Sequence, residues 1–432
     1  MSFGFIEIQR KWAPYVYNNI SHVKVKYWPS SQTGVFLSGT RFGLNMAQRT
    51  ADQPGCVGIH MALASYYLKM KDLTKAEEYL DNASKLDPGN SEVLWLQAKI
   101  RKDKSLEQQT KKCKEKFVPP KQGKLKMKDP FKVERCAFPT LTPQEFLLQY
   151  AVTGKPVIIT GLVQHMTSSP WNIQYIKKVI GHNIIPTRQQ SQESRTVAHI
   201  IDSLHNNRKS SCSYGWTMTS IGSDLTKDLC IPRYVADDFL QRTNTAYRDS
   251  WPCLYIESVG LTEHMQMEPF GLNCWIALFE GRKRFTFVRK EDMPCLYPYC
   301  NDNLDIAFYA NINKPDLQDF PLLSTFTPLE CILEPGEFLF IPSGTAYSSE
   351  ALDDCLVLSG NYVDLSNIDC VKEELNAMKL SNLNIKELFE QLSSEAFPSK
   401  MWSCQNDLKW KEYKHWPREN YQMFDITQSD CL

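Results

Sequence analysis

The sequence predicts an α+β protein in which a β-barrel or β-sandwich lies between two helical regions. Two observations lead to this class. Apolar residues recur at helical spacing over residues 57–100 and again after residue 367. Between these regions, from about residue 136 to residue 366, short apolar runs alternate with turn residues. Strands of such regular length are typical of sandwiches and barrels.

The composition is that of a folded globular protein. The chain has 432 residues, of which 42% are hydrophobic and 23% are charged. It is longer than one hydrophobic core usually serves, so we expect two or three structural units. Its 49 basic and 49 acidic residues balance, and this excludes a general attraction to nucleic acid or to an anionic membrane. With no signal peptide and no stretch near the roughly 18 apolar residues of a membrane span, we expect a cytoplasmic or nuclear protein.

The cysteines do not indicate a zinc site. The chain has 14 of them and no CxxC pair. The closest pair, Cys295 and Cys300, has no histidine nearby that could complete a site. We therefore expect free thiols, as in other proteins of a reducing compartment.

Shifts in composition divide the chain into segments. Residues 1–56 show no clear period and are left unassigned. The other expected segments are a helical region (57–108), a basic linker (109–135), a barrel (136–366) and C-terminal helices followed by a polar tail (367–432).

The helical region has the pattern of two packed helices followed by a third. Asp87-Pro88-Gly89-Asn90 ends the second helix, and Ser91 is expected to cap the third. The pair resembles a tetratricopeptide repeat at Leu63, Ala64, Tyr67, Ala76, Leu80, Ala83 and Pro88. One repeat cannot bury its own face. The region is therefore either a docking surface for a protein or peptide partner, or a support packed on the next domain.

The basic linker contains the runs KKCKEK and KQGKLKMK and two adjacent prolines. A solvated tether explains this composition. A nuclear-import signal or a contact with phosphates are the alternatives, and the linker is the one place where we would expect nucleic acid to bind.

The barrel is expected to begin near a helix start at Thr142-Pro143-Gln144-Glu145. Thr142 is the N-cap, Pro143 takes the first helical position, and Glu145 is the glutamate of a capping box. A first strand over residues 155–160 ends at Gly161. Further strands are expected over residues 253–260, 274–281, 283–289, 331–336 and 355–364, and LEPGEFLFIPSGTAYSSE (333–350) is expected to form a strand, a turn and a strand.

Six segments of this region resemble, in order, the Jumonji-C (JmjC) branch of the cupin superfamily, in particular its small protein hydroxylases. They are GKPVIITG, WPCLYIESVG, EGRKRFTFV, LYP, NINKPDLQDFP and LEPGEFLFIP. The resemblance implies a double-stranded β-helix (a jelly roll). It also implies the family's site, in which a His-x-Asp pair and a distal histidine hold Fe(II) and leave positions open for 2-oxoglutarate and dioxygen.

The residues at the family's iron positions are altered. Aligning Gly260 and Asn273 with the family places Gln266-Met267-Glu268 at His-x-Asp, and Tyr347 stands at the distal histidine. In a second register His264 is the first ligand and Gln266 takes the aspartate position. No histidine occurs over residues 265–414, so a triad of two histidines and one carboxylate cannot be built from the barrel strands. We therefore expect no bound metal.

Lys283 in GRKRF matches the family's cosubstrate lysine, so the resemblance implies that it could bind 2-oxoglutarate or a similar anion. The alternative is that Arg282, Lys283 and Arg284 form a basic strand with solvated faces. Asn273 either points into the barrel beside this site or caps a bulge, and Phe270-Gly271 is expected to form a turn.

Three functions follow from these residues. The first is a JmjC-fold protein that has lost Fe(II) binding, has no cofactor and acts in protein binding or scaffolding. The second is an Fe(II)/2-oxoglutarate-dependent protein hydroxylase or lysine demethylase with non-standard ligands. The third is a metal-free lyase or isomerase, for which Glu268 and Tyr347 are the visible acid and base candidates. The C-terminal helices lie where family members often dimerise, so a homodimer is possible through them.

Overall fold

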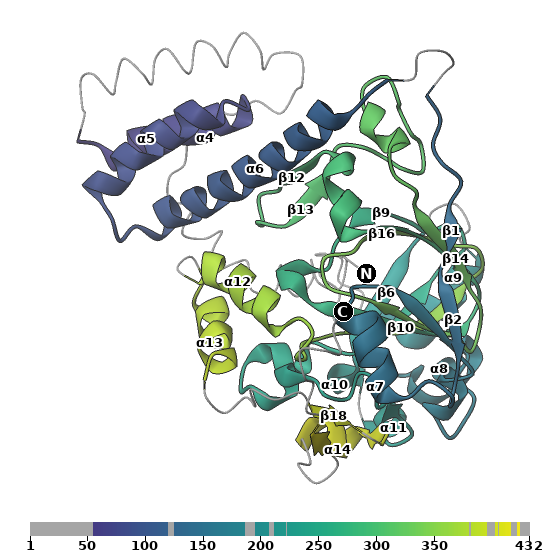
Figure 1. Cartoon of the computed structure of the whole chain (residues 1–432). Coiled ribbons are helices and arrows are strands. Elements are labelled where there is room, and N and C mark those ends of the chain that lie inside the picture. Colours follow the sequence, from purple (N-terminus) through teal and green to yellow (C-terminus); the bar gives the residue numbers. More distant parts are fainter. Residues whose placement is uncertain are drawn as a thin grey trace.

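The computed structural model describes residues 55–119, 125–185, 195–206, 211–221, 223–379, 382–394, 402–404, 406–415 and 421–423. Figure 1 shows a β-barrel with a helical layer on one side and shorter helices around the rest. Among the described helices, none is both long and apolar enough to cross a membrane. The predicted fold class is confirmed: two antiparallel-rich sheets form a jelly-roll barrel, with helices before and after it.

Two sheets make the barrel. The five-stranded sheet has the order β1 (Phe131–Lys132), β14 (Leu329–Leu333), β11 (Lys283–Val288), β16 (Ala346–Ala351) and β9 (Thr262–Gln266). The seven-stranded sheet has the order β2 (Glu134–Ala137), β3 (Val157–Thr160), β15 (Phe338–Ile341), β10 (Asn273–Glu280), β17 (Cys355–Tyr362), β8 (Cys253–Glu257) and β6 (Ser213–Thr217). The predicted strands are confirmed, and residues 333–350 form a strand, a turn and a strand as expected.

The strands alternate their side chains between two cores. One core fills the space between the sheets and includes Ile276, Leu278, Phe285, Phe287, Leu339, Ile341 and Tyr347. The other lies on the outer face of the seven-stranded sheet, beneath α7 (Pro143–Phe146), α8 (Ile173–Ile180) and α9 (Val197–Asn206), and includes Trp275, Ala277, Phe338 and Phe340. Because successive residues of a strand point to opposite faces, the parity of a residue decides whether it enters the barrel.

Local sequence signals set several of these elements. The capping box is present, since Thr142 Oγ1 accepts from the Glu145 backbone at 3.1 Å while the Glu145 carboxylate accepts from the Thr142 backbone at 2.9 Å. Phe270 and Gly271 form the expected turn with positive φ values of 55° and 69°. Gly281 (φ 81°) joins β10 to β11, and a side chain there would meet the Asp354 carbonyl.

The helical layer consists of α4 (Val57–Lys69), α5 (Leu73–Leu86) and α6 (Ser91–Lys116). The packed pair and the third helix are confirmed. The expected cap is wrong by one residue, because Asn90 accepts from the backbone of Glu92 and Val93. Asparagine is among the best N-cap residues, so the helix begins one position after it.

The predicted basic linker is wrong in its first part, because α6 continues to Lys116. Leu106, Thr110 and Cys113 recur at helical spacing on the side of α6 that faces the barrel, and Thr110 donates to the Pro294 carbonyl at 3.1 Å. Two of these three residues are not strongly apolar, which hides the period in the sequence. The lysines are the solvated side of a helix of good helix formers.

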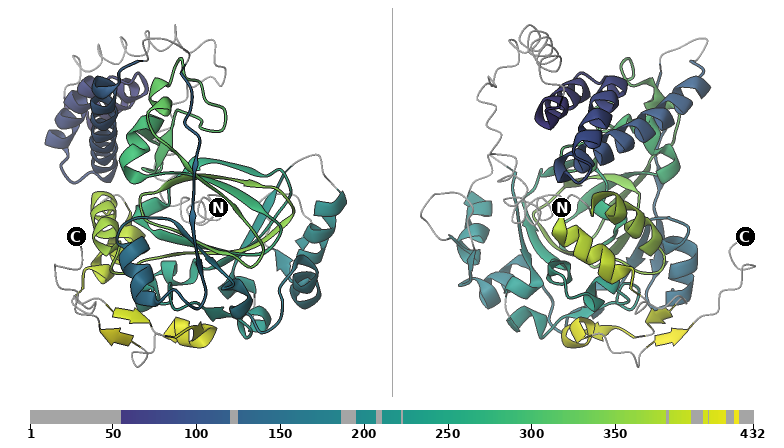
Figure 2. Two further views of the ribbon diagram at one scale, coloured as in Figure 1. Left: turned by 45° about the vertical axis from the view of Figure 1, so that its right-hand side comes forward. Right: turned by 90° about the vertical axis from the view of Figure 1, so that its left-hand side faces the viewer.

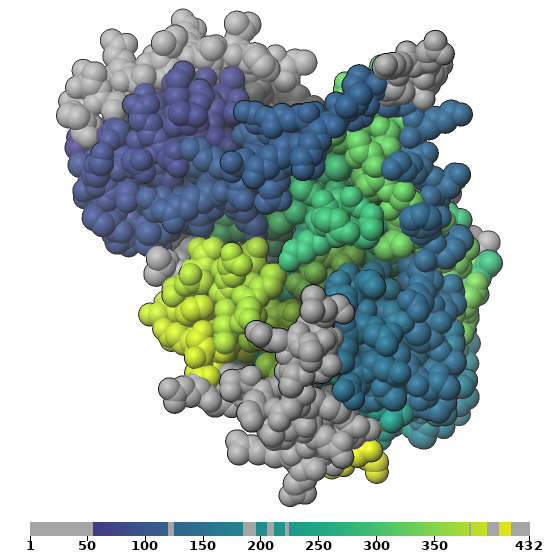
Figure 3. All heavy atoms as spheres, viewed as in Figure 1, coloured from purple at the N-terminus to yellow at the C-terminus, as the bar shows by residue number. Residues whose placement is uncertain are grey.

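The barrel also begins earlier than predicted. β1 pairs with β14 and β2 pairs with β3, so residues 131–137 are part of its sheets. After the barrel, α12 (Ile368–Met378) and α13 (Leu383–Leu392) confirm the C-terminal helices. In the views of Figures 2 and 3, α6 crosses one side of the barrel with α12 and α13 beside it, and Lys102 of α6 pairs with Glu374 of α12 at 2.7 Å.

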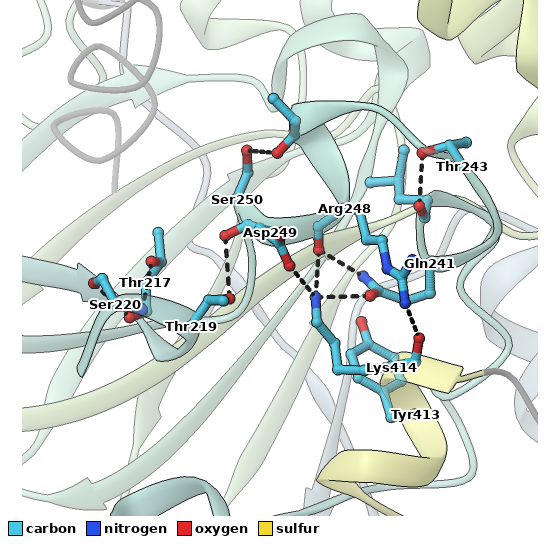
Figure 4. Close-up of polar contacts among 12 residues, drawn as sticks. Thr217, Thr219, Ser220, Gln241, Thr243, Arg248, Asp249, Ser250, Tyr413 and Lys414 are labelled. Carbon is cyan, nitrogen blue, oxygen red and sulfur yellow. Dashed lines mark hydrogen bonds and ion pairs between the residues drawn. The ribbon is translucent and has the colours of Figure 1, made fainter. Parts of the chain in front are cut away.

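The C-terminal segment returns to the barrel instead of trailing away as a tail. β19 (Leu408–Lys409) pairs with β7 (Cys230–Ile231), and α14 (Trp410–His415) follows it. Figure 4 shows how α14 is fixed: Lys414 Nζ lies 2.9 Å from both Gln241 Oε1 and Asp249 Oδ1 and 2.6 Å from the Arg248 carbonyl. The Tyr413 hydroxyl donates to Asp238 at 2.7 Å. We call this arrangement of Tyr413 and Lys414 the C-terminal attachment.

The remaining described α-helices and strands are short. They are α10 (Met218–Ile221), α11 (Ser223–Thr226), β4 (Ile184–Ile185), β5 (Arg195–Thr196), β12 (Pro298–Cys300), β13 (Ile306–Phe308), β18 (Trp402–Cys404) and β20 (Tyr421–Met423). Near the barrel mouth, β12 and β13 form a hairpin against α6: the Cys300 backbone donates to Asp103 at 2.6 Å, and Lys99 pairs with Asp302 at 2.6 Å.

Candidate functional site

The family's iron positions meet where β9 runs beside β16. Tyr347 lies directly opposite Gln266, and Ser349 lies opposite Glu263, so β9 has a bulge between these two pairs. The bulge lets both Glu263 and Gln266 face the barrel although they are three residues apart. The structure thus has the register in which Gln266-Met267-Glu268 faces Tyr347.

Glu268, Tyr347 and Asn361 form a hydrogen-bonded group, and with Gln266, which lies opposite Tyr347, we call it the Tyr347 cluster. The Tyr347 hydroxyl donates to Glu268 Oε1 at 2.5 Å, and the Asn361 amide donates to Glu268 Oε2. Both carboxylate oxygens are therefore engaged. Gln266 Nε2 is buried and has no hydrogen-bond partner among the described residues.

Tyr347 is fully buried between aromatic side chains. Its ring centroid lies 6.4 Å from that of Phe285 and 6.3 Å from that of Phe287. Burial raises the pKa of the Tyr347 hydroxyl well above its usual value, and the adjacent Glu268 carboxylate raises it further. The phenol therefore keeps its proton and acts as a donor to Glu268, which leaves it poorly suited to be a metal ligand or a general base.

A second buried group, the Lys283 cluster, consists of Glu257, Glu263, Lys283 and Ser349. Lys283 Nζ lies 2.7 Å from Glu257 Oε2 and 3.3 Å from Glu263 Oε2. Ser349 Oγ donates to the same Glu263 oxygen at 2.5 Å. The lysine and Glu257 have no exposed side-chain surface, and Glu263 is 8% exposed. A lysine inside the barrel is thus paired with two carboxylates of its own chain.

The three consecutive basic residues, Arg282 just before β11 and Lys283 and Arg284 at its start, separate by parity. Arg282 and Arg284 lie on the outside with side chains 49% and 41% exposed, and they pair with Asp353 and Glu350. The solvated interpretation holds for these two arginines. It is wrong for Lys283, which points into the barrel because its neighbours on a strand point out.

Asn273 joins three backbone segments at the start of β10. Its amide donates to Ser366 Oγ at 3.0 Å and to Asp364 Oδ1 at 3.3 Å, and its carbonyl accepts from the Ser343 backbone at 2.9 Å. The side chain is buried and its amide hydrogen bonds hold loops together. Asn273 therefore neither points into the barrel beside the site nor caps a bulge, the two positions that the sequence suggests for it.

His264 is exposed on β9, between the buried Glu263 and the partly buried Met265. The structure does not bring it to Tyr347, and Gln266 occupies that place instead. The second register, with His264 as first ligand, therefore has no geometric support.

The donor set does not fit Fe(II). The family's site needs imidazole nitrogens and a free carboxylate. The Tyr347 cluster offers an amide, a phenol that holds its proton, and a carboxylate whose two oxygens accept from Tyr347 and Asn361. We derive no reaction step through a metal at this site.

Sequence reasoning missed Glu257, Glu263, Ser349 and Asn361. Parity could have found two of them. Glu257 shares the inward face of its strand with Cys253 and Tyr255, and Asn361 shares that of Cys355 and Val357. A glutamate or asparagine at an inward position of a buried strand requires a polar partner.

Comparison with known proteins identifies relatives of this domain. Residues 263–366 match the Cupin-like domain family, a range that holds the Tyr347 cluster and, apart from Glu257, the Lys283 cluster. The chain is 25% identical over 221 residues to Lysine-specific demethylase 8 of Xenopus tropicalis, covering 49% of this chain and 48% of that protein. It is 21% identical over 275 residues to the Bifunctional arginine demethylase and lysyl-hydroxylase psr-1 of Caenorhabditis elegans, covering 60% and 68%.

A shorter match extends this comparison. HSPB1-associated protein 1 of Rattus norvegicus is 28% identical over 138 residues, covering 31% of this chain and 29% of that protein. The chain spans about half the length of the lysine-specific demethylases that it matches.

Proposed function

We propose that this chain is a member of the Jumonji-C family that has lost Fe(II) binding and serves as a protein-binding or scaffolding module on an oxygenase fold. The observation that carries this proposal is the Tyr347 cluster. At the family's ligand positions, Glu268 accepts hydrogen bonds from Tyr347 and Asn361 instead of facing an open site.

Opening the cluster for a metal would be costly. A metal bound to Glu268 would have to displace the Tyr347 hydroxyl, and a buried donor left without an acceptor costs about 1–3 kcal/mol. Using Tyr347 itself as a ligand would require its ionisation, which burial opposes. Both arguments favour a closed polar core.

The helical layer supports the binding part of the proposal. On α4 and α5, Tyr67 stacks on Tyr79 with centroids 5.4 Å apart, Tyr66 meets Tyr67 edge-on at 5.2 Å, and Lys75 lies 5.2 Å from the Tyr67 ring. All three tyrosines are partly exposed. Tyrosine is enriched at interface hot spots, so we propose that a protein or peptide partner docks on this tyrosine surface. By contrast, the contacts of α6 with the barrel fit a supporting role for that helix.

An anaerobic titration tests the loss of iron. Purified protein is titrated with Fe(II) and 2-oxoglutarate, and the visible charge-transfer band of the ternary complex is followed. We expect no band. A band that saturates at one iron per chain would overturn the proposal. The matched control carries Gln266→His, Glu268→Asp and Tyr347→His, and we expect it to bind Co(II), detected by its absorption, because its donor set is the family's own.

The alternative function is that of an Fe(II)/2-oxoglutarate-dependent protein hydroxylase or lysine demethylase with non-standard ligands. The names of the relatives favour it, since two of them are called demethylases and one also a lysyl-hydroxylase. A positive titration of the wild-type protein would select this alternative.

A separate experiment tests partner docking. The full chain carrying Tyr66→Ser and Lys75→Glu is compared with wild type by quantitative cross-linking in cells. Lys85→Glu, at an exposed position of α5, is the control. We expect the first variant to lose partners that the control keeps, at equal thermal stability. Identical partners for both would favour the view that the whole helical layer only supports the barrel.

A further inference from the structure

The Lys283 cluster joins both sheets of the barrel at one end. Glu257 ends β8 in the seven-stranded sheet, whereas Glu263, Lys283 and Ser349 come from β9, β11 and β16 of the five-stranded sheet. Four strands thus place their inward side chains around one ammonium group. The lysine has no exposed surface, so anything that pairs with it must lie inside the barrel.

Two carboxylates face this single ammonium. Their charges exceed that of Lys283, and Glu257 Oε1 is buried without a hydrogen-bond partner among the described residues. An apolar pair would fill the same space without an unpartnered oxygen, and buried ion pairs are often no more stable than such a replacement. The two glutamates therefore call for an explanation other than stability.

The charges of the two glutamates suggest an explanation for their presence. A dicarboxylate ligand would give a buried lysine two carboxylate groups, and here the chain provides two of its own within 2.7 Å and 3.3 Å of Nζ. Ser349 Oγ donates a hydrogen bond of 2.5 Å to the outer carboxylate, that of Glu263. Glu257 and Glu263 thus give the Lys283 ammonium the two carboxylate partners that a bound dicarboxylate would give it.

We propose that the barrel is self-liganded: Glu257 and Glu263 take the place of an acidic small molecule on Lys283, so the wild-type barrel binds no free dicarboxylate, and removing both side chains uncovers a site for one. This deepens the proposed function and rests on it in one respect, that the barrel no longer serves oxygenase chemistry. It concerns the anion site alone and requires nothing of the metal positions.

The test uses metal-free full-length protein in a chelator, with succinate and 2-oxoglutarate as probes. Binding is measured by calorimetry and by the thermal midpoint of unfolding. Wild type should give no heat and no shift. Glu257→Ala/Glu263→Ala should be stabilised by either acid, and at ten times the dissociation constant its folding equilibrium should rise about elevenfold.

The control adds Lys283→Met to that double variant. It keeps the space and removes the ammonium, so it should bind neither acid. If the double variant does not fold, Glu257→Ser/Glu263→Ser is used with the same readouts, because its hydroxyls can accept from Lys283 while both carboxylates are gone. An acetate control separates recognition of a dicarboxylate from a general salt effect.

Two results would overturn the inference. One is saturable binding of 2-oxoglutarate or succinate to the wild-type protein. The other is a folded double variant that neither acid stabilises, which would make the cluster an ordinary buried ion pair. Neither result depends on iron. Wild type that binds 2-oxoglutarate but no Fe(II) would refute self-liganding alone, whereas wild type that binds Fe(II) alone would refute only the proposed function.

Discussion

The barrel interior and the C-terminal attachment both bury a lysine, and they compensate its charge differently. Lys283 is fully buried and faces two carboxylates. Lys414 keeps 12% of its side chain exposed and faces one carboxylate, Asp249, which is itself 58% exposed. Its other acceptors are the neutral oxygens of Gln241 and Arg248.

The difference indicates two roles: the carboxylates at Lys283 replace a ligand, whereas the contacts of Lys414 hold a helix in place. Inside the barrel, the ammonium is fully buried and has to be compensated by charged groups of the chain. At the attachment, carbonyl dipoles and one solvated carboxylate suffice, and the ammonium serves as a common donor that holds α14 to the barrel (Figure 4). Burial lowers the pKa of Lys414, and Asp249 only partly opposes this effect.

The largest expected effect is that of Lys283→Met. Removing the ammonium leaves Glu257 and Glu263 as uncompensated buried carboxylates, which costs about 3–5 kcal/mol in the free energy of unfolding. Urea denaturation at neutral pH measures it. Adding Glu257→Leu and Glu263→Leu should restore most of the loss, because an apolar set of similar volume replaces a buried pair well. A loss below about 1 kcal/mol for Lys283→Met alone would contradict the contrast with Lys414.

A smaller effect is expected for Tyr347→Phe. This variant tests whether the polar groups of the Tyr347 cluster are hydrogen-bonded to one another, as those of the Lys283 cluster are. The change keeps the ring and removes the donor to Glu268. Because the half-buried Glu268 then loses one of its two donors, we expect a loss of about 1–3 kcal/mol by urea denaturation. Tyr299→Phe is the control, since Tyr299 lies partly exposed and stacks on Tyr309. Equal stability of Tyr347→Phe and wild type would mean that the hydroxyl is not engaged as the structure indicates.

The smallest effect is expected at the C-terminal attachment. Lys414→Met should cost about 1 kcal/mol, the usual net worth of an intramolecular hydrogen bond. The loss should be local, so amide exchange should quicken over residues 408–415 and stay unchanged in β10 and β17. Lys411→Met, at an exposed position of the same helix, should leave exchange as in wild type.

The stability difference between wild type and Lys414→Met should also depend on pH, and the lowered pKa of Lys414 sets the direction of that dependence. The folded pKa of Lys414 lies below its unfolded value, so between the two values the unfolded chain binds more protons. Stability then rises with pH in that window. The stability of wild type relative to Lys414→Met should therefore increase as the pH rises through that window toward the ordinary lysine pKa. A constant difference would indicate that Lys414 is not desolvated.

Parts of the site were predictable because they depend on residue identity and local spacing. The sequence shows directly that histidines are missing and that positions 266, 268 and 347 are altered, and its apolar runs give the positions of the strands along the chain. The capping box at Thr142 and the turn at Phe270-Gly271 formed as local rules predict. The extent of α6 was not predictable in the same way, because its barrel-facing residues include Thr110 and Cys113, whose burial depends on contact with the barrel.

The sequence by itself determined the barrel and the loss of the family's ligand set, since strand periodicity and the presence or absence of histidine are local facts. Only the tertiary structure decided what took the ligands' place. The partners of Lys283 and Glu268 come from other strands, and they meet because the pairing of β9 with β16 and the bulge within it set the register. A shift of one residue in this register would turn Glu263 outward and break its ion pair with Lys283. No local sequence pattern fixes the register.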